Sequence, residues 1–291
     1  MKGLRLALAN LKPGTGKTTS AVWLAHVFAQ AGNSVLLVDA DPSGSALEWS
    51  DLAAMYPRLS LSQAAFPFRI VALPSRELHR RVPEIARADD VVIIDTPQLE
   101  DHASIARSAM RYADEILIPC GPTPIEINRT TPVREEITDL GSVRDKPLRS
   151  SILLNRCITR AHSTTDAREV LEGLGYDVLG TSVPRLEVYA QSFGVPIRHH
   201  GLDIWRNVAQ DLVERCLPRC TIRSLAHCDR PATAASPRYW QRRAGDGRYR
   251  LLALGKVLHP AAVGGQGGAA EVAGVGRDKE GDRRGDLLRF G

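Results

Sequence analysis

Short apolar runs recur along the first 216 residues of the chain, and longer segments with helical spacing of apolar residues separate most of them. Short apolar runs are typical of buried strands, and apolar residues three or four positions apart are typical of amphipathic helices. The pattern predicts strands at Leu4–Ala9, Val35–Val38, Phe68–Leu73, Val91–Ile94, Ile116–Pro119, Ile152–Leu154 and Val178–Val183. It predicts helices at Thr18–Ala31, Ser75–Arg87, Ala103–Tyr112, Pro132–Leu140, Thr165–Leu174 and Ile204–Leu217.

Strands that alternate with helices form right-handed crossover units, which make the strands parallel and cover both faces of the sheet. We therefore expect an α/β fold with a doubly wound, mostly parallel sheet and helices on both faces. Such sheets bind their ligands at the carboxyl ends of the strands. Polar residues directly follow several predicted strands, and we expect them to meet at that edge: residues 12–19, Asp39, Asp41, Asp95 and Asn155.

The alternating pattern ends near residue 217. Residues 217–291 hold 14 Lys and Arg against 7 Asp and Glu, whereas residues 1–216 hold 24 against 26, so the tail carries the positive net charge. We expect one folded domain at residues 1–216 and, at residues 217–291, a basic, Gly- and Arg-rich tail that is disordered or a non-native extension. A nucleic-acid-binding arm is the alternative for the tail. Because the body is near neutral, any nucleic-acid surface on it must be a local patch.

The segment KPGTGKTT at residues 12–19 carries the strongest chemical signal. It follows the first predicted strand and opens the first predicted helix, which is the context of a phosphate-binding loop. Glycines let the backbone wrap around phosphate, so that N–H groups and the helix N-terminus face the anion. We expect Lys17 to reach the β- and γ-phosphates and the Thr18 hydroxyl to bind Mg²⁺. The expected nucleotide contacts are Gly14, Thr15, Gly16, Lys17, Thr18 and Thr19.

The same loop resembles the deviant Walker A motif, KGGxGK[ST], of the ParA/MinD family of P-loop ATPases. The resemblance implies a SIMIBI-like P-loop NTPase fold, ATP and Mg²⁺ as cofactors, and a homodimer that forms on ATP binding. It also implies that Lys12 reaches the nucleotide of the opposite subunit and supplies charge in the transition state. Pro13 stands where the family has glycine. Since proline removes one N–H donor, this departure can slow hydrolysis.

Two acidic segments resemble further elements of that family. VLLVDADPSG at residues 35–44 is similar to its DxDPQG element, which implies that Asp41 orients or activates the attacking water and that Asp39 lies near Mg²⁺. VVIIDTP at residues 91–97 is similar to the Walker B strand, whose carboxylate, here Asp95, holds Mg²⁺ through water. The catalytic set implied by the resemblance is therefore Lys12, Lys17 and Asp41, and the metal set is Thr18, Asp39 and Asp95.

The segment ILLNR at residues 152–156 resembles the adenine-side strand of the family. The resemblance implies that Asn155 reads the edge of the base and that backbone near Pro184 makes the second base contact. It covers residues 1–216. The phosphate loop lies near residue 1, as in the shorter partition ATPases, so we expect no sequence-specific operator binding from the body.

The resemblance implies an ATP-dependent, dimerising ATPase for plasmid or chromosome partition, located in the cytoplasm in association with the nucleoid. In the ATP state it would bind DNA without sequence preference, and a ParB-like centromere-binding partner would stimulate hydrolysis. Basic residues late in the body are the candidate DNA contacts because they can neutralise phosphates. They are Arg185, Arg198, Arg206 and Arg215.

Three alternatives differ from partition in the feature they require. A MinD-like, membrane-associated positioning ATPase needs a C-terminal amphipathic anchor, but Asp203–Leu217 is more typical of a last packed helix, so we expect no membrane. A nucleotide-binding scaffold with weak hydrolysis stays open because of Pro13. A relative of the nitrogenase iron protein would need a second cysteine suitably placed beside Cys120, and none accompanies it.

Overall fold

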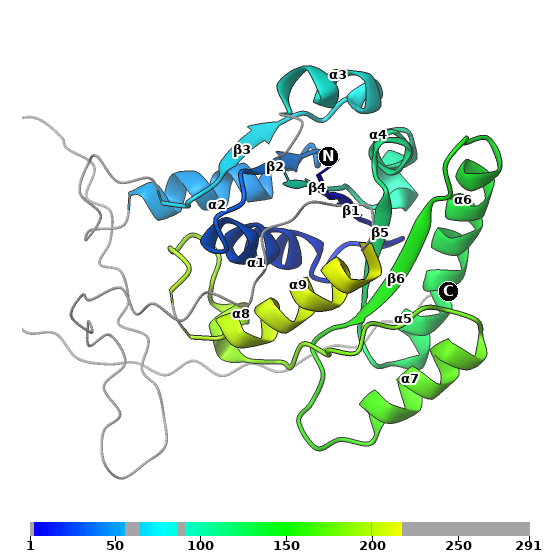
Figure 1. Cartoon of the computed structure of the whole chain (residues 1–291). Helices are drawn as coiled ribbons and strands as arrows, with labels where there is room; N and C mark the ends of the chain where they lie inside the picture. The colour runs from blue at the N-terminus through cyan, green and yellow to red at the C-terminus, as the bar shows by residue number, and fades with distance from the viewer. Residues whose placement is uncertain (1–2, 56–64, 87–90, 199, 217–291) are drawn as a thin grey trace, which may run out of the picture. The chain divides into compact units, whose positions relative to one another are not determined.

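Six parallel strands form the central sheet of the computed structural model, which describes residues 3–55, 65–86, 91–198 and 200–216 (Figure 1). The strands are β1 (Arg5–Leu8), β2 (Val35–Asp39), β3 (Arg69–Ala72), β4 (Val91–Asp95), β5 (Glu115–Cys120) and β6 (Arg149–Leu154). Their order is β3-β2-β4-β1-β5-β6, and every neighbouring pair is parallel. β1 lies inside the sheet and the chain winds outward to both sides, which confirms the expected α/β fold.

Helices cover both faces of the sheet because successive strand residues point to opposite faces. Leu37 and Ile93 enter one core, which α1, α2 and α9 complete. Val38 and Ile94 enter the other core, which α3, α4, α6 and α7 complete. The helices are α1 (Lys17–Gln30), α2 (Ser45–Ala54), α3 (Leu78–Ile85), α4 (Leu99–Tyr112), α5 (Pro124–Asn128), α6 (Thr130–Ser142), α7 (Ser163–Gly173), α8 (Glu187–Ala190) and α9 (Leu202–Cys216).

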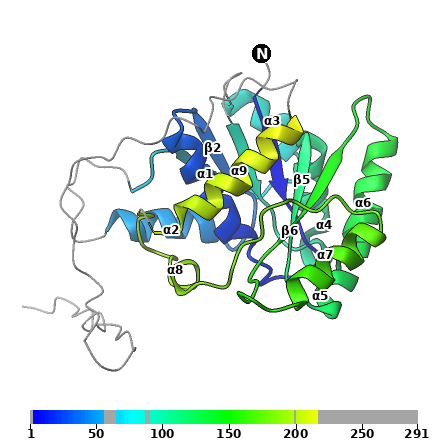
Figure 2. The same cartoon turned by 60° about the horizontal axis from the view of Figure 1, so that its bottom comes forward.

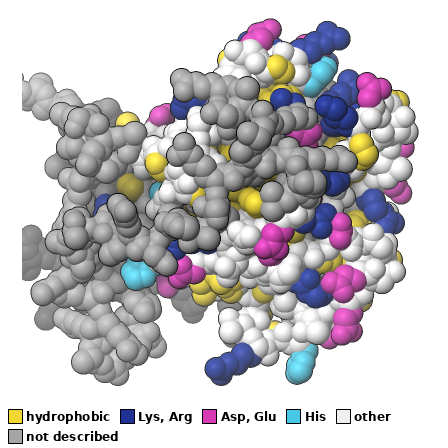
Figure 3. Space-filling view, viewed as in Figure 1, with side chains coloured by type: hydrophobic (Ala, Val, Ile, Leu, Met, Phe, Trp, Pro, Cys, Tyr) yellow, Lys and Arg dark blue, Asp and Glu magenta, His cyan; other side chains and the backbone are white. Residues whose placement is uncertain are grey.

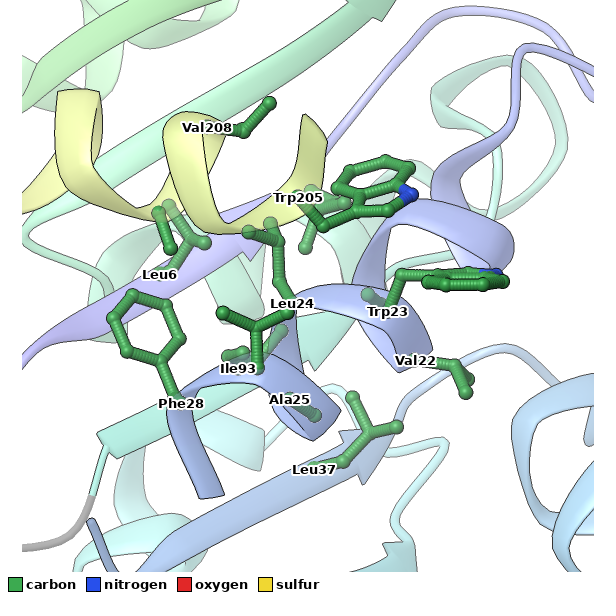
Figure 4. Close-up of a cluster of buried hydrophobic side chains, with 14 of the residues drawn as sticks. Leu6, Val22, Trp23, Leu24, Ala25, Phe28, Leu37, Ile93, Trp205 and Val208 are labelled. Atoms are coloured by element: carbon green, nitrogen blue, oxygen red, sulfur yellow. The ribbon is translucent and has the colours of Figure 1, made fainter. Parts of the chain in front are cut away.

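The last described helix, α9, lies beside α1, as both views show (Figures 1 and 2). Trp205 of α9 is fully buried and stacks on Trp23 of α1, with ring centroids 6.4 Å apart (Figure 4). Tyr189 packs its edge against both rings, with centroids 5.0 Å from Trp23 and 5.9 Å from Trp205. The apolar face of α9 is therefore part of the core, as the sequence predicted for a last packed helix.

The predicted seventh strand at Val178–Val183 is wrong. The segment meets β6 at two separate places, through a bridge between Ile152 and Val178 and through the Val183 N–H, which donates to the Leu154 carbonyl at 2.8 Å, and it forms no continuous ladder between them. The Arg168 guanidinium donates hydrogen bonds to the carbonyls of Leu179 and Gly180 at 2.7 and 3.2 Å. Side chains thus satisfy backbone groups that a strand would offer to its neighbour, so the apolar run does not extend the sheet.

Three helices were not predicted, namely α2, α5 and α8. The spacing of Ala46, Trp49 and Ala53, all buried, is a helical signal that could have identified α2. The helices α5 and α8 are too short to show a period.

Two predicted helices begin at different residues. α3 starts at Leu78 and α4 starts at Leu99, four residues earlier than predicted, with a kink at His102, where φ is −131°. The expected tail at residues 217–291 lies outside the described residues, so that expectation stays a prediction. Within the described ranges, no helix combines the length and the apolar character needed to cross a bilayer.

Candidate nucleotide-binding site

The segment expected to bind phosphate joins β1 to α1. Its two glycines have left-handed backbone conformations, with φ of +74° at Gly14 and +93° at Gly16, which only glycine adopts without strain. Gly16 directly precedes α1, and no side chain in the described part of the chain forms a cap there. The first N–H groups of α1, at Lys17, Thr18 and Thr19, are therefore available to an anion.

Lys17 is a buried cation inside this loop. Its Nζ donates to the carbonyl oxygen of Lys12 at 3.4 Å, and it forms no ion pair with a described residue. Burial lowers the pKa of Lys17, while the charges of Asp95 and Asp41 act in the opposite direction. The Thr15 hydroxyl is also buried without a hydrogen-bond partner among the described residues. A bound phosphate would compensate both groups, because burying polar and charged groups without partners is costly.

Two aspartates end neighbouring strands beside the loop. Asp39 of β2 and Asp95 of β4 are opposite each other in the sheet register. Asp39 accepts hydrogen bonds from the backbone N–H groups of Asp41 and Leu47 at 3.2 and 2.9 Å. Asp95 is buried, and neither of its carboxylate oxygens has a well-formed hydrogen bond within the described ranges. Burial raises the pKa of Asp95 to about 7; the Thr18 hydroxyl lowers it and the charge of Asp39 raises it.

The environment of the Asp95 carboxylate is suited to a bound cation. A buried carboxylate without donors is unstable when ionised, and a divalent cation beside it removes that cost. No group of three or more His, Cys, Asp or Glu that could hold a metal occurs among the residues described. Mg²⁺ does not need such a group, since it is usually bound by one or two carboxylates, water and substrate phosphates. Asp95, Asp39 and Thr18 therefore suit Mg²⁺ only together with a phosphate group.

Asp41 lies in the turn between β2 and α2. Its Oδ1 accepts the backbone N–H of Ser43 at 2.9 Å, which leaves the second oxygen open in the half-buried side chain. The negative charge of Asp41 raises the pKa of Lys17 in the phosphate loop, against the effect of burial. A half-exposed carboxylate beside a phosphate loop can hydrogen-bond a water molecule.

Asn155, the predicted base contact, lies directly against the loop. Its Nδ2 donates to the carbonyl of Thr15 at 3.3 Å. A methyl group built on Gly16 would lie only 2.4 Å from that nitrogen, so glycine is required there for a second reason. Pro184 forms a parallel bridge with Cys157, two residues after Asn155, which brings the predicted second base contact to the same edge.

Lys12 does not approach the loop it begins. Its ammonium forms an ion pair with both carboxylate oxygens of Glu100, in the first turn of α4. Backbone bonds support this contact: Leu99 N–H donates to Asn10 O at 3.1 Å, and Glu100 N–H donates to Leu11 O at 3.3 Å. Sequence reasoning missed Glu100, and no local signal could have found it, because the pair spans 88 residues.

The four candidate DNA arginines do not act as one group. Arg185 and Arg198 are exposed, as a DNA contact requires. Arg206 donates to Asp203 of the same helix at 2.7 Å. On the face shown in Figure 3, cationic and anionic side chains are interspersed over the described surface instead of forming a single basic patch.

Arg215 is paired with acidic residues of its own domain. It donates to Asp177 at 2.7 Å and lies 3.4 Å from the fully buried carboxylate of Glu115. Glu115 also pairs with Arg149 at 3.2 Å. Removing Arg215 would therefore take a partner from a buried charge, so we assign it to stability and not to the DNA surface.

The sequence matches the profile of the CobQ/CobB/MinD/ParA nucleotide binding domain over residues 6–197. The chain belongs to this family. It is 34% identical over 188 residues to maintenance of carboxysome distribution protein A of Halothiobacillus neapolitanus, covering 65% of this chain and 82% of that protein. It is 25% identical over 244 residues to the chromosome-partitioning ATPase Soj of Thermus thermophilus, covering 72% and 96%. The fold is similar to that of Mycobacterium smegmatis cobyrinic acid a,c-diamide synthase with bound ATP analogue and magnesium, with TM-score 0.59, 18% identity and coverage of 74% and 96%.

The chain is thus a ParA/MinD-type P-loop ATPase of the partition and positioning class, and its cofactors are ATP and Mg²⁺. The open N-terminus of α1, the buried Lys17 and the Asp95 carboxylate, which has no well-formed hydrogen bond to a described residue, fit these groups. Asp95, Asp39 and Thr18 would hold Mg²⁺, which would supply positive charge against the phosphates. The protein's own contribution is a preorganised set of N–H donors and charges around the phosphates.

Proposed function

We propose that this ATPase is a nucleotide-controlled switch that pairs with a second copy when both hold ATP. The pair binds DNA without sequence preference, and a cargo-bound partner triggers hydrolysis and release. The observation that carries the proposal is the position of Lys12, whose ammonium is bound by Glu100 while its carbonyl faces Lys17. The lysine side chain is therefore not used by its own phosphate loop and is free to serve the other subunit once the ion pair opens.

The residues of the site have distinct roles in this proposal. Gly14, Thr15 and Gly16 hold the phosphates through backbone N–H groups, and Thr19 adds the N–H of the first turn of α1. Lys17 binds the β- and γ-phosphates, and Thr18 ligates Mg²⁺. These roles rely on the left-handed glycines and the uncapped helix.

The three aspartates of the site have separate roles. Asp95 holds Mg²⁺ through water, because its oxygens have no other well-formed partner among the described residues. Asp39, fixed by two backbone N–H groups, shapes the turn that positions Asp41. Asp41 orients the attacking water. Asn155 and the backbone at Pro184 contact the adenine.

DNA binding provides the decisive test. Fluorescence anisotropy with a labelled duplex of arbitrary sequence should show binding with ATP, but not with ADP or without nucleotide. Lys12→Ala should lose this binding while still binding ATP. Equal binding in all three nucleotide states would refute the switch.

The exposed arginines allow a second measurement on the same duplex. Replacing Arg185 and Arg198 by glutamine should weaken binding and reduce its salt dependence, since the slope falls by about one for each phosphate interaction that is removed. Arg107→Gln is the matched control, because Arg107 pairs with Glu136 on the surface between α4 and α6. An equal loss in the control would contradict the proposed surface.

The cargo has two candidates. Plasmid or chromosomal DNA bound by a ParB-like protein is the first, supported by the likeness to the partition ATPase Soj. A protein compartment is the second, supported by the 34% identity to a carboxysome distribution protein. Stimulation of ATP turnover by a ParB-type protein with its centromere DNA favours the first, and stimulation by a carboxysome adaptor protein favours the second. Either cargo implies association with the nucleoid.

Among the described helices, α9 is the candidate for the C-terminal amphipathic anchor that a MinD-like ATPase needs. The apolar face of α9 is buried against α1, so it is not available to a lipid surface. We therefore expect no ATP-dependent binding to anionic phospholipid vesicles. Sedimentation of the protein with such vesicles in ATP, but not in ADP, would contradict this expectation.

A scaffold with weak hydrolysis would owe its slowness to Pro13. Pro13→Gly should raise ATP turnover several-fold, because it restores one N–H donor to the loop. Steady-state phosphate release by the two proteins measures the change. Unchanged turnover would remove Pro13 as a cause.

A further inference from the structure

Arg156 links the base side of the site to the phosphate loop. It follows Asn155 and has a left-handed backbone, with φ of +57°, which is uncommon for a residue with a side chain. Its Nη1 donates to the carbonyl oxygen of Gly14 at 3.0 Å. Its Nη2 lies 2.6 and 2.7 Å from the two carboxylate oxygens of Glu126 in α5. Neither Arg156 nor Glu126 belongs to the proposed phosphate, metal or base contacts.

The contacts of Glu126 extend to the loop after β5. Its Oε2 also accepts the backbone N–H of Gly121 at 2.7 Å. A methyl group built on Gly121 would lie 2.8 Å from that oxygen, so this residue is small where the carboxylate approaches. The backbone N–H of Asn155 donates to the carbonyl of Cys120 at 2.8 Å. The loops that follow β1, β5 and β6 are therefore tied together by one hydrogen-bonded network around Arg156.

This network fixes the direction of two successive peptide groups. The carbonyl of Gly14 is held by Arg156, and the carbonyl of Thr15 is held by Asn155. In a trans peptide the N–H points opposite to the carbonyl of the same unit. The N–H groups of Thr15 and Gly16 are thereby turned away from Arg156 and Asn155. Two successive N–H groups held in this way form an anion-binding concavity.

We propose that Arg156, held by Glu126, is a positioning residue: it orients the loop N–H groups that bind the diphosphate part of ADP and ATP. It acts by fixing the Gly14 carbonyl and does not touch the nucleotide. The left-handed φ at Arg156 is strained for a residue with a side chain, and such strain persists only where surrounding contacts determine it. Here those contacts are the bonds to Gly14 and Glu126, together with the backbone N–H of Arg156, which donates to Asn155 Oδ1 at 2.8 Å.

The rival interpretation is that Arg156 itself binds phosphate when nucleotide enters. The two differ in the role of Glu126. If Arg156 is a positioning residue, Glu126→Gln weakens nucleotide binding, because the guanidinium loses its anchor. If Arg156 binds phosphate directly, Glu126→Gln releases the guanidinium and leaves binding equal or tighter.

The experiment measures dissociation constants for ADP, ATP and AMP by calorimetry on the full chain and on Arg156→Gln, Arg156→Lys and Glu126→Gln. Losing a hydrogen bond from a charged group should weaken ADP and ATP binding about tenfold in Arg156→Gln and in Glu126→Gln. Arg156→Lys should recover part of the loss, since a lysine can still donate to one carbonyl. AMP binding should change less than ADP binding, whereas a general loosening of the fold would weaken both alike.

Arg107→Gln is again the control, because it removes a similar arginine–glutamate pair that joins α4 to α6. It should match the wild type in nucleotide binding, and thermal melting should show that all variants are folded. Unchanged binding in Arg156→Gln, or equal or tighter binding in Glu126→Gln, would overturn the proposal. The inference rests on residues 12–19 binding phosphate, and a wild-type chain without nucleotide affinity would refute that assignment together with it.

Discussion

Lys12 and Glu100 form an ion pair beside the phosphate loop, with side chains 33% and 46% exposed. Glu100 belongs to the first turn of α4, which directly follows the strand that ends in Asp95. Backbone hydrogen bonds join the same two segments, so the pair is not an isolated surface contact. The residue proposed to cross to a partner's nucleotide is therefore held within its own subunit by the helix after β4.

The ion pair predicts that Glu100 opposes dimerisation. Glu100→Gln should lower the ATP concentration at which half of the protein is dimeric by about two- to fivefold, because an exposed pair of this kind contributes up to about 1 kcal/mol. Analytical ultracentrifugation at a series of ATP concentrations measures this change. The effect should shrink at high salt, since partly exposed charges are screened.

Asp101→Asn is the control for the loss of an acidic residue in the first turn of α4. Asp101 accepts a hydrogen bond from Gln98 at 2.8 Å, and no ion pair to Lys12 involves it. It should leave the ATP dependence unchanged. A higher ATP requirement in Glu100→Gln would instead mean that Glu100 prepares Lys12 for the partner.

Alanine substitutions at the two loop glycines should differ in their effects on nucleotide binding and stability. Gly16→Ala should lose nucleotide binding and destabilise the fold by roughly 1–3 kcal/mol, since it combines a left-handed φ with a contact of 2.4 Å to Asn155. A methyl group built on Gly14 has no described atom within 4 Å. Gly14→Ala should therefore lose only the stability that its left-handed backbone conformation costs an alanine. Urea unfolding and ADP calorimetry on both variants test the difference. Equal losses would show that backbone strain, and not the contact with Asn155, limits the loop.

The raised pKa of Asp95 predicts a pH-dependent stability in the absence of nucleotide. Because this carboxyl binds its proton more tightly when folded, the free energy of unfolding should fall as pH rises from about 4 towards 7. Asp95→Asn should remove this part of the pH dependence and, at pH 8 without Mg²⁺, stabilise the protein by about 1–3 kcal/mol. It should also weaken binding of ATP with Mg²⁺.

Urea unfolding of the wild type and of Asp95→Asn at pH 5 and pH 8 measures this effect. The gain in stability should be larger at pH 8, where the wild-type carboxyl is ionised. The wild type should bind ATP with Mg²⁺ more tightly above pH 7 than below it, for the same reason. If the free energies of unfolding of Asp95→Asn and wild type differed by the same amount at both pH values, Asp95 would not titrate in this range.

The packing of α9 predicts a large stability loss from one substitution. Trp205→Ala should cost about 3–5 kcal/mol of unfolding free energy, because the ring is fully buried between Trp23 and Tyr189. Ile158→Ala is the control, since Ile158 is 61% exposed and should change stability by less than about 0.5 kcal/mol. If Trp205→Ala left the melting temperature unchanged, α9 would not be part of the core.

The phosphate loop could be predicted because its chemistry is local. Gly14, Gly16 and Lys17 are neighbours in the chain, and the strand and helix on either side have clear apolar patterns. The convergence of Asp39 and Asp95 was also predictable, because the carboxyl ends of parallel strands meet at one edge. The prediction of a seventh strand failed because side-chain hydrogen bonds, such as those from Arg168 to the carbonyls of Leu179 and Gly180, interrupt the backbone ladder with β6.

The layer structure, the nucleotide loop and the order of its acidic elements follow from local sequence patterns, since each depends on residues close together in the chain. The pairing of distant groups follows from the three-dimensional fold alone: Lys12 with Glu100, Arg156 with Glu126 and Gly14, and Arg215 with the buried Glu115. A charged side chain looks the same in sequence whether it is solvated or paired. Its role follows from strand order and helix packing, because these set which opposite charge lies within reach.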